Sequence, residues 1–126
     1  MSRVLVDTSV WVEHFRQRNA ALVSLLMMSR VLIHPMVLGE LACGSPPSRV
    51  KTLADLARLE PAQQAQLREV MDFVERERLF GLGCGLVDIS LLASTLMTQG
   101  SELWTLDKRL AGLTDRFGVM HRPLVH

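Results

Sequence analysis

Several features that organise other small proteins are missing from this chain of 126 residues. It has no tyrosine, and its two cysteines, Cys43 and Cys84, lie far apart without C-x-x-C spacing. That arrangement is typical of reduced packing residues rather than of a disulfide or a zinc site. No apolar run is long enough to cross a bilayer, and the N-terminus lacks the charged, apolar and small-residue order of a signal peptide. We therefore expect a soluble cytoplasmic protein.

An excess of charge of either sign is also absent. The 14 lysines and arginines nearly balance the 13 aspartates and glutamates, which gives a formal net charge of +1. A non-specific nucleic-acid binder would be strongly basic, so charge alone argues neither for nor against RNA as a ligand. The length predicts one domain, residues 1–126, that buries enough surface to fold without a disulfide or cofactor.

Short aliphatic runs alternate with amphipathic segments along the chain. We predict strands at residues 4–6, 31–33 and 103–106, with further candidate strands at 79–80 and 119–121. We predict helices at residues 10–18, 20–28, 35–44, 50–59, 60–78, 86–99 and 108–114. Wholly apolar short strands are typical of a parallel sheet that is buried on both faces, so the sequence predicts an α/β fold.

One stretch interrupts this alternation. Ser48 follows two prolines and is the expected N-cap of the 50–59 helix, and Glu60-Pro61 is expected to begin the next helix directly. Four apolar residues of that helix have the spacing of an inward face: Leu67, Val70, Met71 and Val74. We therefore expect a helical hairpin over residues 48–78 with no strand in it.

Four carboxylates stand where a solvated surface would not place them. Asp7 and Asp107 each directly follow a short hydrophobic strand, and parallel strands present their carboxyl ends at one edge of the sheet. Glu40 lies among apolar same-face neighbours on the 35–44 helix. Asp88 opens the most apolar helix of the chain, where the positive end of the helix dipole favours an anion.

Each of these residues also has a purely structural interpretation. Asp7 and Asp107 could be helix N-caps, Asp88 could be a first-turn partner of the helix dipole, and Glu40 could reach solvent. Other acidic residues alternate with arginines and are typical of an ordinary solvated helix face: Glu69, Asp72, Glu75 and Glu77.

Several carboxylates with little else beside them favour metal-assisted phosphodiester hydrolysis. Mg²⁺ and Mn²⁺ prefer oxygen ligands, and one ion, or two about 4 Å apart, would activate a water molecule and stabilise the leaving oxygen. No histidine base is then required. The four histidines have no metal-ligand spacing and are typical of surface or packing residues: His14, His34, His121 and His126.

The order of these motifs resembles the PIN domain, and the size and the glycine-rich lead into Asp88 resemble the VapC-type toxins of bacterial toxin–antitoxin pairs. The resemblance extends over essentially the whole chain. Four short motifs carry it: Asp7-Thr8-Ser9, Leu38-Gly39-Glu40-Leu41, Val87-Asp88 followed by Leu91-Leu92-Ala93, and Trp104-Thr105-Leu106-Asp107.

This resemblance implies a three-layer α/β/α domain with a central, mainly parallel sheet, acting as a Mg²⁺- or Mn²⁺-dependent endoribonuclease. The implied metal ligands and catalytic residues are Asp7, Glu40, Asp88 and Asp107. It further implies that Ser9 and Thr105 support a carboxylate or a water molecule by hydrogen bonding, although Ser9 could equally cap a helix. A homodimer and a VapB-type antitoxin that covers the pocket are implied as well, with the first helix, the Glu40 helix and residues 48–78 as contact surfaces.

Substrate binding and two other functions stay open. No basic patch adjoins the expected site, and Lys108 and Arg109 are the nearest candidates for phosphate contact, or merely solvated. The opening strand and aspartate also resemble phosphatases of the haloacid dehalogenase type, but Ser9 stands where those enzymes carry a second aspartate as proton donor. The remaining alternative is a non-catalytic PIN-like module that binds RNA or protein.

Overall fold

Four parallel strands form the centre of the fold in the computed structural model, which describes residues 1–124. The strands are β1 (Arg3–Val6), β2 (Val31–Ile33), β3 (Glu60–Pro61) and β4 (Ser101–Trp104). The helices are α1 (Thr8–Arg16), α2 (Ala20–Met27), α3 (Pro35–Ala42), α4 (Arg49–Ala57), α5 (Leu67–Glu77), α6 (Leu86–Met97) and α7 (Lys108–Arg116). The predicted α/β fold with a parallel sheet is confirmed.

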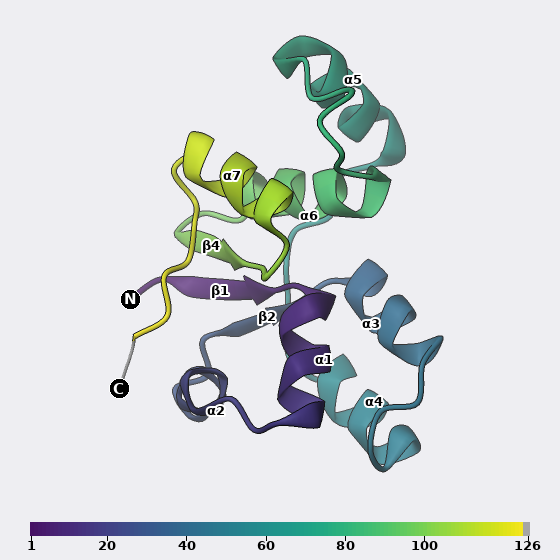
Figure 1. Cartoon of the computed structure of the whole chain (residues 1–126), viewed down its shortest axis with the longest axis vertical. Coiled ribbons are helices and arrows are strands. Elements are labelled where there is room, and N and C mark those ends of the chain that lie inside the picture. The colour runs from purple at the N-terminus through teal and green to yellow at the C-terminus, as the bar shows by residue number, and fades with distance from the viewer. Residues whose placement is uncertain (125–126) are drawn as a thin grey trace.

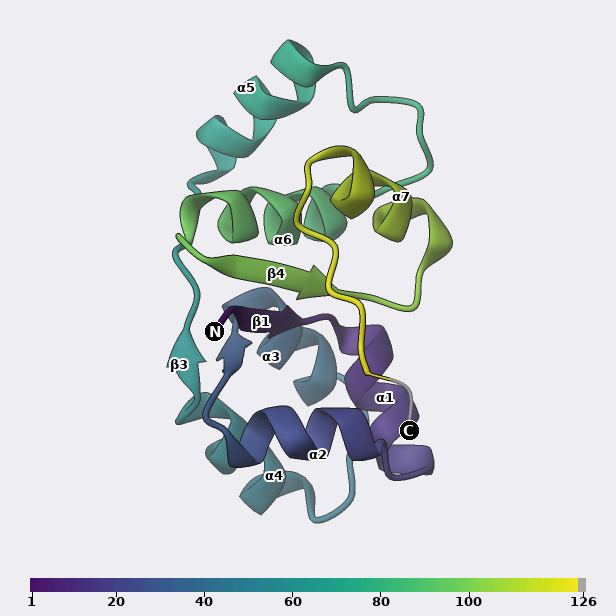
Figure 2. The same ribbon diagram turned by 90° about the vertical axis from the view of Figure 1, so that its left-hand side faces the viewer.

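The sheet has the strand order β3-β2-β1-β4, so β1 lies at its centre beside β4. Val4, Leu5 and Val6 have no solvent-exposed area. Because successive side chains of a strand point to opposite faces, three buried neighbours in a row require cover on both faces. Figure 1 shows α5, α6 and α7 beyond β4 and α1 to α4 around β2, and Figure 2 shows α2 in front of the sheet with α3 behind it.

Helix α6 is the most enclosed helix, as its apolar sequence predicts. Seven consecutive residues, 89–95, are buried, and the helix packs on β4, α5 and α7. Its amino end carries Asp88, so the burial of this helix fixes where that carboxylate lies. No helix within residues 1–124 is long and apolar enough to span a membrane.

The predicted helix start at Glu60-Pro61 is wrong. These two residues form β3, which pairs in parallel with Leu32 and Ile33, and the Ala62 N–H donates to the Ile33 carbonyl at 2.9 Å. A proline that suits the first turn of a helix also suits the outermost strand of a sheet, where its missing N–H breaks no ladder bond. A strand therefore lies between α4 and α5, and the expected strandless hairpin does not exist.

The start of α5 also changes which of its residues face inward. The helix begins after Gln66, whose N–H donates to the Glu69 carboxylate at 2.9 Å. Val70 and Phe73 are buried, whereas Leu67 and Met71 are each 58% exposed, so the predicted inward face is only partly right.

Three smaller expectations also fail. Ser48 occupies the N-cap position of α4 but makes no side-chain capping bond, because its backbone is left-handed with φ of 47°. Residues 79–80 are not a strand, although Leu79 is buried as an anchor. Of residues 119–121, only Met120 forms a bridge, to Leu103 of β4.

Candidate active site

Asp7 is the first residue beyond β1, at the carboxyl end of the central strand. Its backbone N–H donates to the Trp104 carbonyl at 2.9 Å, which places it directly beside the end of β4. Its Oδ1 accepts from the Thr8 N–H at 2.8 Å, so the side chain is also the N-cap of α1. The residue is only 6% exposed.

Two hydroxyl groups hold the second oxygen of this carboxylate. Ser9 Oγ donates to Asp7 Oδ2 at 2.8 Å, and Thr105 Oγ1 donates to the same oxygen at 2.7 Å. Each hydroxyl also accepts a backbone bond, from the Leu106 N–H at 3.0 Å and from the Asp107 N–H at 3.1 Å respectively. The loop from β4 to α7 is therefore bonded to Asp7 through these hydroxyls, as the D-x-S and T-x-D motifs led us to expect.

Asp107 is brought beside Asp7 by this network and begins the helix that follows. Its Oδ1 accepts from the Arg109 N–H at 2.9 Å and from the Leu110 N–H at 3.0 Å, so it is the N-cap of α7. Its Oδ2 receives no hydrogen bond from residues 1–124 and faces an exposed position. The capping and site interpretations of Asp107 are thus compatible, because each uses a different oxygen.

Glu40 reaches the same edge of the sheet from α3. Thr8 Oγ1 donates to Glu40 Oε1 at 2.6 Å, which joins α3 to the first residue of α1. The expectation that Glu40 lies on a buried face is wrong, because its neighbours Met36 and Cys43 are exposed and only Val37 is buried. Exposure follows from the position of α3 at the edge of the fold, and it leaves the carboxylate accessible.

Asp88 completes the group from the first turn of α6, where its Oδ2 accepts from the Gly85 N–H at 3.2 Å. Partial burial raises the pKa of Asp88 above its ordinary value, and the Gly85 bond opposes that effect. Three further negative charges raise the pKa of this carboxyl as well, and they are those of Asp7, Asp107 and Glu40. Four segments distant in sequence thus bring mutually repelling carboxylates to one edge of the sheet.

The donor set fits a hard divalent cation. One oxygen each of Glu40, Asp88 and Asp107 accepts no hydrogen bond from the described residues, and no cationic side chain within residues 1–124 forms an ion pair with any of the four carboxylates. Oxygen ligands without a neutralising partner are what Mg²⁺ and Mn²⁺ prefer. No three His, Cys, Asp or Glu side chains in this part of the chain stand close enough to hold an ion as they are, so binding requires these side chains to move together.

Thr8 is a functional candidate that our sequence reasoning missed. Its hydroxyl orients Glu40 while its N–H is capped by Asp7, so it contacts two of the four acidic residues. The available signal was its place between Asp7 and Ser9 in the first motif, but the D-x-S pattern assigns no role to the middle residue.

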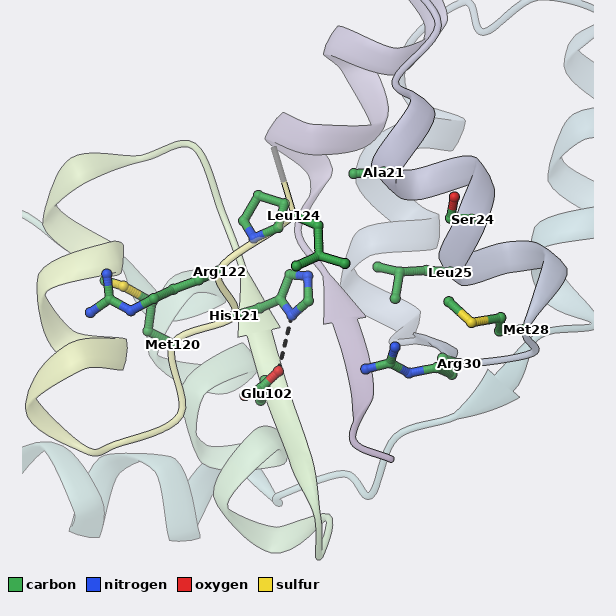
Figure 3. Close-up of a pocket in the computed structure, with 11 residues that line it drawn as sticks. Ala21, Ser24, Leu25, Met28, Arg30, Glu102, Met120, His121, Arg122 and Leu124 are labelled. Atoms are coloured by element: carbon green, nitrogen blue, oxygen red, sulfur yellow. Dashed lines mark hydrogen bonds and ion pairs between the residues drawn. The ribbon is translucent and has the colours of Figure 1, made fainter. Parts of the chain in front are cut away.

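The described histidines have structural roles, as expected. His34 Nδ1 accepts from the Met36 N–H at 3.0 Å and caps α3. His121 pairs with Glu102 at 3.0 Å and lies against Trp104. Figure 3 shows this pair at a cavity of about 460 Å³ between α2 and the carboxyl-terminal segment, which none of the four carboxylates lines. His126 lies outside the described residues.

Comparisons with known proteins agree with this arrangement. The chain is 45% identical over 116 residues to Ribonuclease VapC32 from two strains of Mycobacterium tuberculosis, and the match covers 92% of this chain and 94% of the relative. The fold is similar to one chain in the crystal structure of DNA-bound VapBC from Salmonella typhimurium, with a TM-score of 0.64, 19% identity and 96% of both chains covered. No family model matches the sequence. The identity to the mycobacterial ribonucleases extends over nearly the whole chain, and so the chain belongs to the VapC family of PIN-domain ribonucleases.

Proposed function

We propose that this chain is a Mg²⁺- or Mn²⁺-dependent endoribonuclease and the toxin of a VapBC-type toxin–antitoxin pair. The observation that carries the proposal is the mutual effect of the four carboxylates, seen in the raised pKa of Asp88. Such repulsion costs folding free energy, so its concentration at the carboxyl edge of a parallel sheet favours a site that a cation neutralises. Membership in the VapC family supports RNA as the substrate.

In this proposal Asp7, Glu40, Asp88 and Asp107 hold the divalent ion. When bound, the ion would supply charge for activating water and for stabilising the leaving oxygen of a phosphodiester. Ser9 and Thr105 keep the Asp7 carboxylate in one orientation, and Thr8 does the same for Glu40. No histidine lies in this group, so deprotonation of the nucleophile does not depend on an imidazole.

A VapB-type antitoxin is the proposed partner. A groove of about 380 Å³ runs between α1 and the end of α3, with Val12, Phe15 and Leu41 among its lining residues. Glu40 lines the same groove, so a peptide seated there would cover a proposed metal ligand. This placement agrees with the expected contact surfaces on the first helix and the Glu40 helix. The neighbouring fold, which was solved as a VapBC complex, supports an antitoxin of this kind.

Three further properties belong to the proposal. We propose that residues 1–126 act as one PIN-like domain, that the protein works in the cytoplasm, and that it forms a homodimer. Exposed Met36, Leu67 and Leu86 surround a groove of about 490 Å³ between α3, α5 and α6, and apolar surface of this kind is often covered in assemblies. Sedimentation of the purified protein would test the dimer.

Cleavage of total bacterial RNA with and without Mn²⁺ tests the proposed activity. We expect cleavage by the wild-type protein that EDTA abolishes, and none by Asp88→Asn, because this change removes one charge and leaves an acceptor for the Gly85 N–H. Asp88→Asn is a cleaner test than Asp7→Asn, since both Asp7 oxygens accept hydrogen bonds and an amide nitrogen would face a donor.

Asp72→Asn on the exposed face of α5 is the matched control, and it should keep the wild-type rate. Cleavage by Asp88→Asn at the wild-type rate after stringent purification would contradict the proposal. RNA binding without cleavage in any divalent ion would identify the chain as a binding module instead.

A further inference from the structure

Arg109 lies against the glycine-rich loop that leads into α6. The side chain starts from the second residue of α7 and covers Gly83 so closely that a Cβ built there would stand 2.6 Å from Nη1, 2.7 Å from Cδ and 2.9 Å from Cζ. Gly83 also has φ of +81°, a conformation that glycine adopts freely. The absence of a side chain at residue 83 therefore creates the space that the guanidinium occupies.

This guanidinium has no partner among residues 1–124. It forms no ion pair and donates no side-chain hydrogen bond there, although Asp107 lies only two residues earlier. The backbone N–H of Arg109 bonds to Asp107, but the five side-chain N–H donors remain free. Arg109 is itself exposed, so a ligand in solvent can reach these donors.

The guanidinium lies on the same side of the molecule as two of the carboxylates. Cys84, next to Gly83, has its thiol pKa raised first by burial and then by the charges of Asp88 and Asp107, while the charge of Arg109 lowers it. All three charged groups are thus near one atom of the loop. Lys108 exerts no such effect on Cys84, although it precedes Arg109 directly.

We propose that the Arg109 guanidinium, held on Gly83, binds a backbone phosphate of the RNA beside the four carboxylates. This inference rests on the proposed function. An acidic site repels a polyanion, and a planar guanidinium at its rim offers paired donors that match two phosphate oxygens. The position selects Arg109 over Lys108 as the phosphate contact, and it assigns a task to the glycine-rich loop, which keeps the guanidinium in place.

The first test measures cleavage by Arg109→Gln, with an RNA oligonucleotide that carries the site mapped from total bacterial RNA. We expect KM to rise about tenfold, since charge-assisted hydrogen bonds are the strong ones, with a smaller change in kcat. The dependence of log(kcat/KM) on log salt should become shallower by about 0.7, the value for one phosphate contact on a single strand. Arg109→Lys should recover the salt dependence but only part of the affinity, because it keeps the charge and loses the fork.

Gly83→Asn tests the role of the loop. Asparagine tolerates a positive φ better than most residues, but its Cβ would displace the guanidinium. Its KM should rise like that of Arg109→Gln, and the double variant should be no worse than either single variant, because both changes remove one contact. Arg68→Gln on α5 is the matched control for lost charge and should behave as wild type.

A binding measurement separates this inference from the proposed activity. In the Asp107→Asn background, where asparagine still caps α7, fluorescence anisotropy reports RNA binding without turnover. Adding Arg109→Gln should weaken that binding about tenfold. If the wild type cleaves RNA while Arg109→Gln leaves KM, salt dependence and binding unchanged, or if Lys108→Gln has the larger effect, the inference is overturned and the proposed function stands. If binding depends on Arg109 but no RNA is cleaved, the proposed function fails and the phosphate contact stands.

Discussion

Replacing Thr105 by valine should weaken both the fold and the metal site, because one hydroxyl serves both. In the structure Thr105 Oγ1 donates to the buried Asp7 carboxylate at 2.7 Å and accepts from the Asp107 N–H at 3.1 Å. Valine has nearly the same shape, so it removes the bonds without creating a cavity. A hydrogen bond to a charged group contributes about 1.5 to 3 kcal/mol. Ser9 still donates to the same oxygen and the position is partly open to water, so we expect about 1.5 kcal/mol, near the lower limit.

Thermal unfolding in EDTA measures the structural part of this effect. For a chain of this size, a loss of about 1.5 kcal/mol lowers Tm by roughly 4 to 8 °C. Mn²⁺ titration and RNA cleavage measure the functional part, where a lost partner of a metal ligand costs about 10- to 100-fold. Thr105→Ser retains the hydroxyl and should restore most of both. A Thr105→Val protein with wild-type Tm, Mn²⁺ affinity and cleavage would refute the role we assign to this hydroxyl.

Three other predictions follow from charge and exposure. Burial lowers the pKa of His34 below its ordinary value of 6.5, and the neutral ring caps α3, so the unfolded chain binds more protons and Tm should fall as the pH drops below about 6.5. His34→Asn, which caps without titrating, should flatten that fall, and an unchanged pH profile would count against it. Burial and neighbouring carboxylates raise the pKa of Asp88, so ionisation destabilises the metal-free fold as the pH rises above 3.8, and Asp88→Asn should melt higher than wild type in EDTA at neutral pH. A lower Tm would show that the repulsion is unimportant. Glu75→Gln, on the exposed face of α5, should leave the cleavage rate within a few-fold, and a large loss would place the site elsewhere.

The elements that place the site could be predicted from the sequence because their signals are local and agree with one another. Val4 to Val6 is too short and too apolar for anything but a buried strand, and Asp7 had to follow its end. The same reasoning located Asp107 after β4. Neighbouring parallel strands then bring the two residues together, and the Asp7 N–H bond to Trp104 shows how directly they meet.

The failures occur where one local signal is compatible with two structures. Pro61 suits the first turn of a helix and also an outermost strand, and only the contact with Ile33, far away in the sequence, decides between them. Glu40 could not be placed on the open side of α3 from its spacing alone, because the spacing shows a shared face but not which face is covered. The Thr8 bond to Glu40 is of the same kind, since it joins residues 32 positions apart.

The most direct test of the shared cation site is a calorimetric titration of Mn²⁺ into the wild-type protein and into four single variants, Asp7→Asn, Glu40→Gln, Asp88→Asn and Asp107→Asn. We predict saturable binding to the wild type and at least about tenfold weaker binding in each variant, because each removes one ligand charge from the same ion site. Wild-type affinity in any one of the four folded variants would remove that residue from the site. No saturable binding to the wild type, or unchanged affinity in all four variants, would contradict the existence of a metal centre at this edge of the sheet.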